Sequence, residues 1–254
     1  MRSRILVLLL VTLLALPMTA VMPPVQASTQ RQELAASTLA AKKKHKKARP
    51  RFRTVRQPIA QTFSSAGAIA IPAINNGDPT GSPANPYPSV LDVTGFTNGV
   101  ITDVNLTLNG FSHTAPDDVD VLLAATHLPG QNAIVLSDVG WQLDALDLNL
   151  MLDDQATAAL PDNGPLVSGT FLPTNFNAAA DGVDLFSGVT PSGNTALSVF
   201  NGSNPNGSWQ LFVVDDLGGD KGSISSWTLQ ITAEVNVQVK VKKDKKKGGK
   251  KGKH

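Results

Sequence analysis

The chain has 254 residues, of which 41% are hydrophobic and 17% charged, and its formal net charge is +2. This length is enough to bury a sizeable core in one or two domains, which excludes a small scaffold that depends on cross-links. The absence of cysteine excludes disulfides, thiol nucleophiles, iron–sulfur clusters and cysteine-ligated zinc. Aromatic residues make up only 5% of the chain, so a site lined by many aromatic rings is not expected.

The small net charge conceals blocks of opposite sign. Residues 28–57 carry ten Lys or Arg against one acid, and residues 240–254 carry nine Lys against one acid. Residues 58–239 instead carry eighteen acids against one base. The sequence therefore predicts an acidic body between two basic arms.

Residues 1–27 have the pattern of a secretory signal peptide. Arg2 and Arg4 precede an unbroken apolar run from Ile5 to Leu16, and small residues lead up to a cleavage position near Ala27. The run is shorter than the about 20 residues that span a bilayer as a helix. We expect a cleaved signal, a secreted protein and no membrane span after signal removal, with an uncleaved membrane anchor as the alternative.

The two basic arms, residues 28–57 and 240–254, are expected to be disordered, because dense like charges repel and few apolar residues accompany them. Such arms attract polyanions, among them anionic cell-surface polymers, acidic lipid headgroups and nucleic acid bound without base specificity. The alternative is that they are solvated tails that only improve solubility. The lysines that we expect to bind polyanions are Lys42, Lys43, Lys44, Lys46, Lys47, Lys245, Lys246 and Lys247.

Residues 58–239 are predicted to form an all-β domain. Apolar and polar residues alternate with a period of two at 103–109, 146–153, 209–213 and 227–231, and clusters of Gly, Pro, Asn and Asp separate these stretches. The more apolar runs at 119–125 and 133–136 predict central strands. We predict a jelly-roll β-sandwich, with an ordered loop at residues 75–88 and a second irregular stretch at residues 155–193.

Two segments of this body resemble a known family. The first runs from Leu106 to His113-Thr114 and on to Asp118-Val119-Asp120, and the second contains Gly207-Ser208-Trp209-Gln210-Leu211 followed by Asp220-Lys221-Gly222 and Trp227-Thr228-Leu229. They are similar to the P domain, or Homo B domain, of proprotein convertases and of secreted bacterial subtilisin-like proteases. The resemblance covers about residues 85–233. It implies a non-catalytic β jelly roll that supports the folding and stability of an adjoining protease.

The residues of this motif also have a physical interpretation. Trp209 and Trp227 fall on the inward phase of two strands, so we expect both to lie in the core rather than to stack on a ligand. His113 is expected to form hydrogen bonds that cap the end of a strand. Ser112 beside it does not form a catalytic dyad in this interpretation, because neighbours on a strand face opposite sides. No catalytic residues are recognisable, and we expect a protein that is not itself an enzyme.

Seventeen of the eighteen acids in the body are Asp, and they gather in the segments between predicted strands. Short carboxylates at strand ends can converge on Ca²⁺, although Asp is also a common turn residue. We therefore predict a structural calcium ion. The candidate ligands form two sets, Asp138, Asp144 and Asp154 in one and Asp215, Asp216 and Asp220 in the other.

The sequence leaves two functions open. The first is a secreted, non-catalytic, calcium-stabilised β module whose basic arms bind anionic surfaces or polymers. The alternative is an accessory or fragment of a subtilisin-like serine endopeptidase system, with a protease as its partner.

Overall fold

A computed structural model of the chain describes residues 50–65, 67–71, 82–176 and 184–241. These residues form thirteen β-strands and two short 3₁₀ helices, Pro116–Asp118 and Leu197–Phe200, and none of them lies in an α-helix. The prediction of an all-β fold is confirmed. The predicted signal peptide, the lysines of both basic arms other than Lys240, and residues 75–81 of the predicted loop lie outside the described residues. In the described part of the chain, no helix has the length and apolar character needed to cross a membrane.

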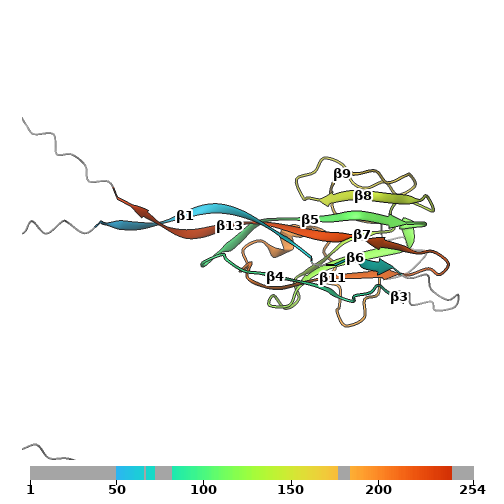
Figure 1. Ribbon diagram of the computed structural model, residues 1–254, viewed down its shortest axis with the longest axis horizontal. Helices are drawn as coiled ribbons and strands as arrows, with labels where there is room; N and C mark the ends of the chain where they lie inside the picture. The colour runs from blue at the N-terminus through green and yellow to red at the C-terminus, as the bar shows by residue number, and fades with distance from the viewer. Residues whose placement is uncertain (1–49, 66, 72–81, 177–183, 242–254) are drawn as a thin grey trace, which may run out of the picture. The chain divides into compact units, whose positions relative to one another are not determined.

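The strands form two sheets that share one core (Figure 1). The first sheet has seven strands, in the order β1-β13-β5-β12-β2, with β8 also paired to β5 and β9 paired to β8. Their bounds are Phe52–Ser64, Ser226–Lys240, Val100–His113, Gly222–Ile224, Ile69–Ile71, Ala145–Leu152 and Gly169–Phe171, in the order given.

The second sheet has six strands, in the order β10-β7-β6-β11-β3 with β4 also paired to β11. Their bounds are Thr174–Asn175, Asn132–Ser137, Val119–Ala125, Gly207–Asp215, Ser82–Pro83 and Ser89–Val93. Strands β6 and β7 contain the two runs that the sequence assigns to central strands, and every residue in both is buried. Strands β9 and β10 lie within the stretch predicted to be irregular, and each pairs in parallel with its neighbour.

The sandwich core is anchored by the two tryptophans of the P-domain-like motif. Trp209 on β11 and Trp227 on β13 are both fully buried, as predicted. Each indole N–H finds an acceptor, Trp209 donating to the carbonyl of Pro205 at 3.0 Å and Trp227 to Ser89 Oγ at 2.9 Å. The second bond joins β13 of one sheet to β4 of the other. Both rings therefore bury a large apolar surface without leaving a polar atom unpaired.

A second, smaller apolar cluster covers the outer face of the second sheet. Phe186, in a segment between strands, packs with Leu122, Ile134 and Phe212 from the sheet. This cover explains why β6 and β7 are buried on both faces and lack the alternation of the solvent-facing strands.

Strand β8 departs from the predicted alternation at its beginning. Leu146, expected to point into the core with Leu148, Leu150 and Leu152, is 69% exposed. Asp147 follows it with a φ of 52°, and the register with β5 shifts between Leu108 and Phe111 and again before His113. The irregularity reverses the side-chain phase, because a shift of one residue in a strand exchanges its two faces.

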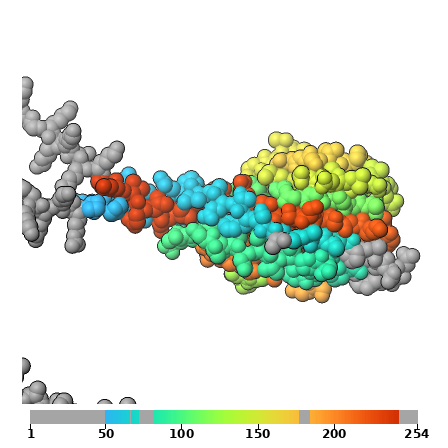
Figure 2. All heavy atoms as spheres, viewed as in Figure 1, coloured from blue at the N-terminus to red at the C-terminus, as the bar shows by residue number. Residues whose placement is uncertain are grey.

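The boundary of the folded body also differs from the prediction. Residues 52–57 and Lys240, assigned to disordered arms, are parts of β1 and β13. These two strands pair in continuous register from Phe52↔Lys240 to Ser64↔Thr228, whereas β5 accompanies β13 only as far as Glu234↔Val100. Residues 52–57 and 235–240 thus form a two-stranded ribbon beyond β5, visible at the left of the strands in Figure 1 and as blue and red spheres in Figure 2. One face of the ribbon is apolar, because it carries Val55 from β1 and Val235, Val237 and Val239 from β13. The count of charges along the chain does not reveal this face.

Strand β1 lies at the edge of the first sheet, and two contacts show which of its residues form hydrogen bonds with β13. Val241 N–H donates to the carbonyl of Arg51 at 2.8 Å, and Ser65 N–H donates to the carbonyl of Trp227 at 2.9 Å. In an antiparallel pair the bonded residues alternate, so odd-numbered residues of β1 turn their backbone groups toward β13 and even-numbered residues turn theirs to the free edge. Pro58 is even-numbered, and its missing N–H interrupts the free edge rather than the ladder with β13.

Candidate functional site

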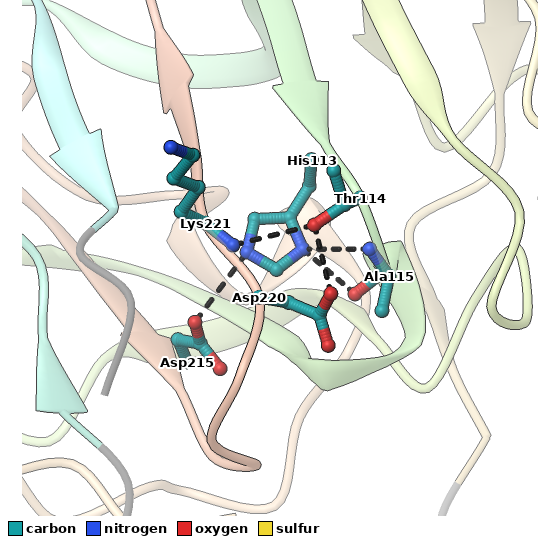
Figure 3. Close-up of polar contacts among 6 residues, drawn as sticks. All are labelled: His113, Thr114, Ala115, Asp215, Asp220 and Lys221. Carbon is teal, nitrogen blue, oxygen red and sulfur yellow. Dashed lines mark hydrogen bonds and ion pairs between the residues drawn. The ribbon is translucent and has the colours of Figure 1, made fainter. Parts of the chain in front are cut away.

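A buried histidine–aspartate pair joins the two sheets at one end of the sandwich (Figure 3). His113 ends β5 in the first sheet, and Asp215 ends β11 in the second. His113 Nε2 lies 3.4 Å from Asp215 Oδ2, and neither side chain reaches solvent. Neither oxygen of Asp215 has a hydrogen-bond partner. Because a buried unpaired charge is costly, each residue depends on the other.

The other ring nitrogen of His113 contacts the backbone just beyond β5. His113 Nδ1 lies 2.7 Å from the carbonyl oxygen of Ala115, and the backbone N–H of Ala115 points to the same nitrogen at 3.3 Å. The first contact needs Nδ1 as a donor and the second needs it as an acceptor, so the tautomer is not fixed by these bonds. Both contacts lie at the end of β5, where the sequence predicts that His113 caps a strand.

A turn closes over this pair from the solvent side. Thr114 Oγ1 donates to Asp220 Oδ1 at 2.8 Å and accepts from the backbone N–H of Lys221 at 3.4 Å. Gly222 follows, and a Cβ at this position would collide with the backbone of Ser112 and with the His113 ring. A glycine is therefore required here so that β12 can pass next to the imidazole.

Asp118 is the second buried acid at this end of the sandwich. Its side chain is buried and its Oδ2 has no hydrogen-bond partner. Burial, followed by the charges of Asp216, Asp215 and Asp220, raises the pKa of Asp118 to about 7. His113 acts in the opposite direction but does not compensate for these effects.

Asp120 lies two residues further along, on the outer face of β6. Burial raises its pKa well above the ordinary value, and the nearby charge of Asp184 acts in the same direction, whereas a hydrogen bond with Ser137 lowers it. The residue is buried because the segment carrying Phe186 covers this face of the sheet. This burial is not predicted by the sequence pattern, since Asp120 occupies the phase of β6 that would otherwise face water.

The two predicted calcium sets are placed differently in the structure. In the first set Asp144 is exposed, Asp138 accepts from Ser137 Oγ, and Asp154 accepts the backbone N–H groups of Leu197 and Ser198 at the start of a 3₁₀ helix. In the second set Asp215, Asp216 and Asp220 are near enough to Asp118 to raise its pKa. Among the residues that the structure describes, no three His, Cys, Asp or Glu side chains are grouped in a way that could hold a metal ion. Calcium binding stays a prediction.

Ser112 is not paired with the neighbouring histidine. Its Oγ accepts the backbone N–H of Asp147 at 2.9 Å on the β8 side, while the His113 ring is buried in the core. The Oγ of Ser112 is therefore not placed to be activated by the His113 ring.

Apart from Lys221, the exposed Arg and Lys residues of the described chain lie on the ribbon or directly before it. Arg51, Arg53, Arg56 and Lys240 are all exposed, and Glu234 is the one acid on the paired segments. The guanidinium of Arg56 donates to the backbone carbonyl of Glu234 at 3.5 Å. The lysines expected to bind polyanions, from Lys42 to Lys47 and from Lys245 to Lys247, lie outside the described residues but continue the same two chain segments.

The comparisons with known proteins agree with the motif. Residues 180–231 match the family model described as the proprotein convertase P-domain. The match contains Trp209, Asp215, Gly222 and Trp227, and it confirms the resemblance of this chain to that family. The other motif segment is brought beside it in the fold, because Leu106 pairs with Leu229 and Leu108 with Trp227.

Two solved structures are similar to this chain. One is the serine protease of Aeromonas sobria in complex with its chaperone, with 14% identity, a TM-score of 0.32, and coverage of 72% of this chain and 27% of that chain. The other is the serine protease of Aeromonas sobria without it, with 15% identity, a TM-score of 0.33, and coverage of 71% and 27%. This chain thus spans about a quarter of the length of each. No curated protein matches it.

The His113–Asp215 pair predicts a non-additive mutant cycle. His113→Ala leaves Asp215 buried without its partner and should lower the free energy of unfolding by about 3–5 kcal/mol. Removing both side chains should cost clearly less than the sum of the single changes, because neither charge is then stranded. Chemical denaturation of the two single variants and the double variant measures this coupling. Asp92, at the opposite end of β11 on β4, provides a control pair with His113 that should be additive within about 0.5 kcal/mol.

The raised pKa of Asp118 predicts that the free energy of unfolding decreases as the pH rises. Its folded pKa of about 7 exceeds the ordinary 3.8, so between these values the folded state binds more protons than the unfolded state. The stabilisation is complete below about pH 4 and is lost as the pH approaches 7. Asp118→Asn stays neutral at all these pH values. Between pH 5 and pH 8, its free energy of unfolding, measured by urea denaturation, should fall by about 2 kcal/mol less than that of the wild type. The exposed Asp92→Asn should follow the wild-type curve, and identical slopes for all three proteins would contradict the assignment.

Proposed function

We propose that this protein is a secreted, non-catalytic β module that binds anionic polymers through its basic ends. The observation that carries this proposal is that the ribbon, with the residue directly before it, presents Arg51, Arg53, Arg56 and Lys240 to solvent beyond β5. A folded element here positions cations that the sequence alone assigns to a tail. The role as a solubilising tail gives no reason for pairing these residues in a sheet.

The distribution of charge also supports a polyanionic partner. Residues 58–239 have a large excess of acids, whereas the residues before and after them are strongly basic. An anionic polymer is attracted to the basic end and repelled by the acidic body, so the charge pattern orients the module on its ligand. Binding of this kind is strongly salt-dependent and does not select a base sequence.

Calcium is part of the proposal as a stabilising ion, with Asp215, Asp216 and Asp220 as its ligands. What supports it is that each of these three carboxylates is near enough to Asp118 for its like charge to oppose the ionisation of Asp118. A divalent cation would reverse this electrostatic penalty.

The polymer-binding role predicts a specific loss of affinity in the ribbon. Replacing Arg51, Arg53 and Arg56 together with Ser should weaken binding of long-chain inorganic polyphosphate at least ten-fold in low salt and reduce the slope of log affinity against log salt by about 2–3. Fluorescence titration over a salt series measures both quantities. Lys221→Ser removes the single base of the acidic body and should change neither. Unchanged affinity in the triple variant, or absence of wild-type binding, would contradict the proposal.

A second candidate function is favoured by the family match at residues 180–231. In it the protein is an accessory of a subtilisin-like serine endopeptidase and stabilises that enzyme by docking. The same β module would serve this role, with the protease as partner in place of the polymer.

This second function predicts that the folded module protects a protease. An equimolar amount of the chain should lengthen the thermal half-life of a subtilisin-like catalytic domain that lacks its own P domain, measured with a fluorogenic peptide. The Arg51, Arg53 and Arg56 triple variant should protect as well as the wild type, because those residues belong to polymer binding. Equal half-lives with and without the chain would exclude this function for the enzyme tested.

A further inference from the structure

The free edge of β1 carries backbone groups that no other described strand pairs with. β1 is the last strand of the first sheet, and among the residues that the structure describes, β13 is the one strand that pairs with it. Because Arg51 and Ser65 bond to β13, the even-numbered residues between them turn their N–H and C=O groups to the free edge. The blue spheres of β1 lie at the surface in Figure 2. An exposed edge of this kind can accept a further strand.

Pro58 divides this edge into two parts. It is even-numbered and has no N–H, so the ladder of a strand added along the ribbon is interrupted at this position. The part on the ribbon side offers the N–H groups of Phe52, Thr54 and Arg56, and all three residues are exposed. These residues span about 14 Å, which matches the pairing length of a short extended peptide.

The side chains beside the ribbon part of the edge are cationic on both faces. Arg53 is odd-numbered and shares a face with Val55, whereas Arg56 is even-numbered and lies on the opposite face. Both arginines are exposed, and Arg51, also exposed, directly precedes the strand. The guanidinium of Arg56 donates to the backbone carbonyl of Glu234 at 3.5 Å, a contact that leaves its charge unpaired by that carboxylate. A strand of complementary charge therefore carries acids on both of its faces.

From this free, cationic edge we infer that the segment from Arg51 to Arg56 is a docking site for an extended acidic peptide of a partner protein, which adds to the sheet as an antiparallel strand. Antiparallel pairing is the more stable of the two directions. A second copy of β1 is disfavoured as the occupant, because it would place arginines opposite arginines. The inference goes beyond the proposed polymer binding, since a phosphate polymer has no N–H groups with which to extend a sheet.

The two arginines determine the pattern of acids in the peptide. Arg53 and Arg56 are three positions apart, so the acids that face them are also three positions apart and lie on opposite faces. Val55 favours an apolar residue next to the acid that faces Arg56. The peptide acetyl-Glu-Val-Thr-Glu-Val-Glu-amide has this pattern, and its positions one to six face residues 56 to 51 in that order.

The first test separates backbone pairing from attraction by charge. Fluorescence anisotropy of the labelled peptide, titrated with the full chain in low salt, measures affinity. N-methylation at positions three and five removes the N–H groups that face Thr54 and Phe52, and should weaken binding at least about ten-fold. N-methylation at positions two and four, whose N–H groups point away from β1, should change affinity by less than about two-fold. Equal affinity of the two methylated peptides would mean attraction by charge alone and would overturn the inference.

The second test removes one donor of the edge from the protein. Thr54→Pro deletes an N–H that faces the free edge but keeps the ladder with β13, and should weaken binding of the peptide about five-fold to ten-fold. Thr62→Pro is the matched control, because Thr62 is also even-numbered and exposed but lies beyond Pro58. It should bind the peptide as the wild type does. Thermal denaturation confirms that both variants are folded, and the methylated peptides test the wild-type chain whatever that result.

The third test determines the register and direction of the peptide. Arg56→Glu should weaken binding about five-fold, because it places two acids opposite each other. A peptide with lysine at position one, which faces residue 56, should recover this loss. Lysine at position four, which faces Arg53, should weaken binding further. Recovery with lysine at position six instead would reverse the direction of the peptide and overturn the antiparallel docking.

The outcomes distinguish this docking site from polymer binding. A wild-type chain that binds polyphosphate but not the peptide overturns the docking site and leaves the polymer-binding function intact. Peptide binding that follows the methylation pattern, in a chain that does not bind polyphosphate, supports the docking site and contradicts polymer binding alone. Thr54→Pro should bind long-chain polyphosphate as tightly as the wild type, because it changes no charge.

Discussion

The structure depends on the pairing of β13 with its two neighbours. Along one edge it pairs with β1 for thirteen residues, and along the other it pairs with β5 from Ser226↔Asn109 to Glu234↔Val100. The inward residues of this strand, Trp227, Leu229 and Ile231, are fully buried in the sandwich core. The same strand then runs past β5 and forms the ribbon with β1. One element thus supplies the apolar centre of the body and the folded base of the cationic end.

The end of the sandwich opposite the ribbon shows a different balance. His113, Asp215 and Asp118 are buried together, and several of their polar atoms have no hydrogen-bond partner. Such a network costs stability unless protons or a cation compensate for the carboxylates. The acidic end and the basic end therefore depend on solution conditions in different ways, the first on pH and the second on ionic strength.

Period-two patterns predicted much of this fold from the sequence. Both tryptophans, the buried strands β6 and β7, and the role of His113 at the end of β5 follow from alternation and motif. Three features could not be read from it. The irregularity at Asp147 turns Leu146 outward, the cover from Phe186 buries Asp120, and valines spaced two apart hold charged residues in a strand. Each depends on a neighbour distant in sequence, which periodicity in a single segment does not encode.

Of the candidate site, the sequence identified the charged residues but not their grouping. The two sets of Asp were chosen by their spacing along the chain. In the fold, members of the first set form separate hydrogen bonds, Asp138 with Ser137 and Asp154 with the backbone of Leu197 and Ser198. Asp118 was missed because its position before β6 resembles an ordinary turn, and only the approach of β11 buries it. The pairing of Arg53 and Arg56 with the end of β13 likewise required knowledge of the register of β1 with β13.

The adjacency of Arg51 and Val241 has a mechanical consequence. A force applied between these two residues pulls along the direction of the interstrand bonds, and so loads them one pair at a time, starting at Phe52↔Lys240. Peeling of this kind requires far less force than sliding two strands past each other with all bonds loaded together. When both strands are attached to the same surface, they share the load, and the hydrogen bonds between them are not pulled apart. A module built in this way resists drag on its body, yet opens readily when its ends are drawn apart.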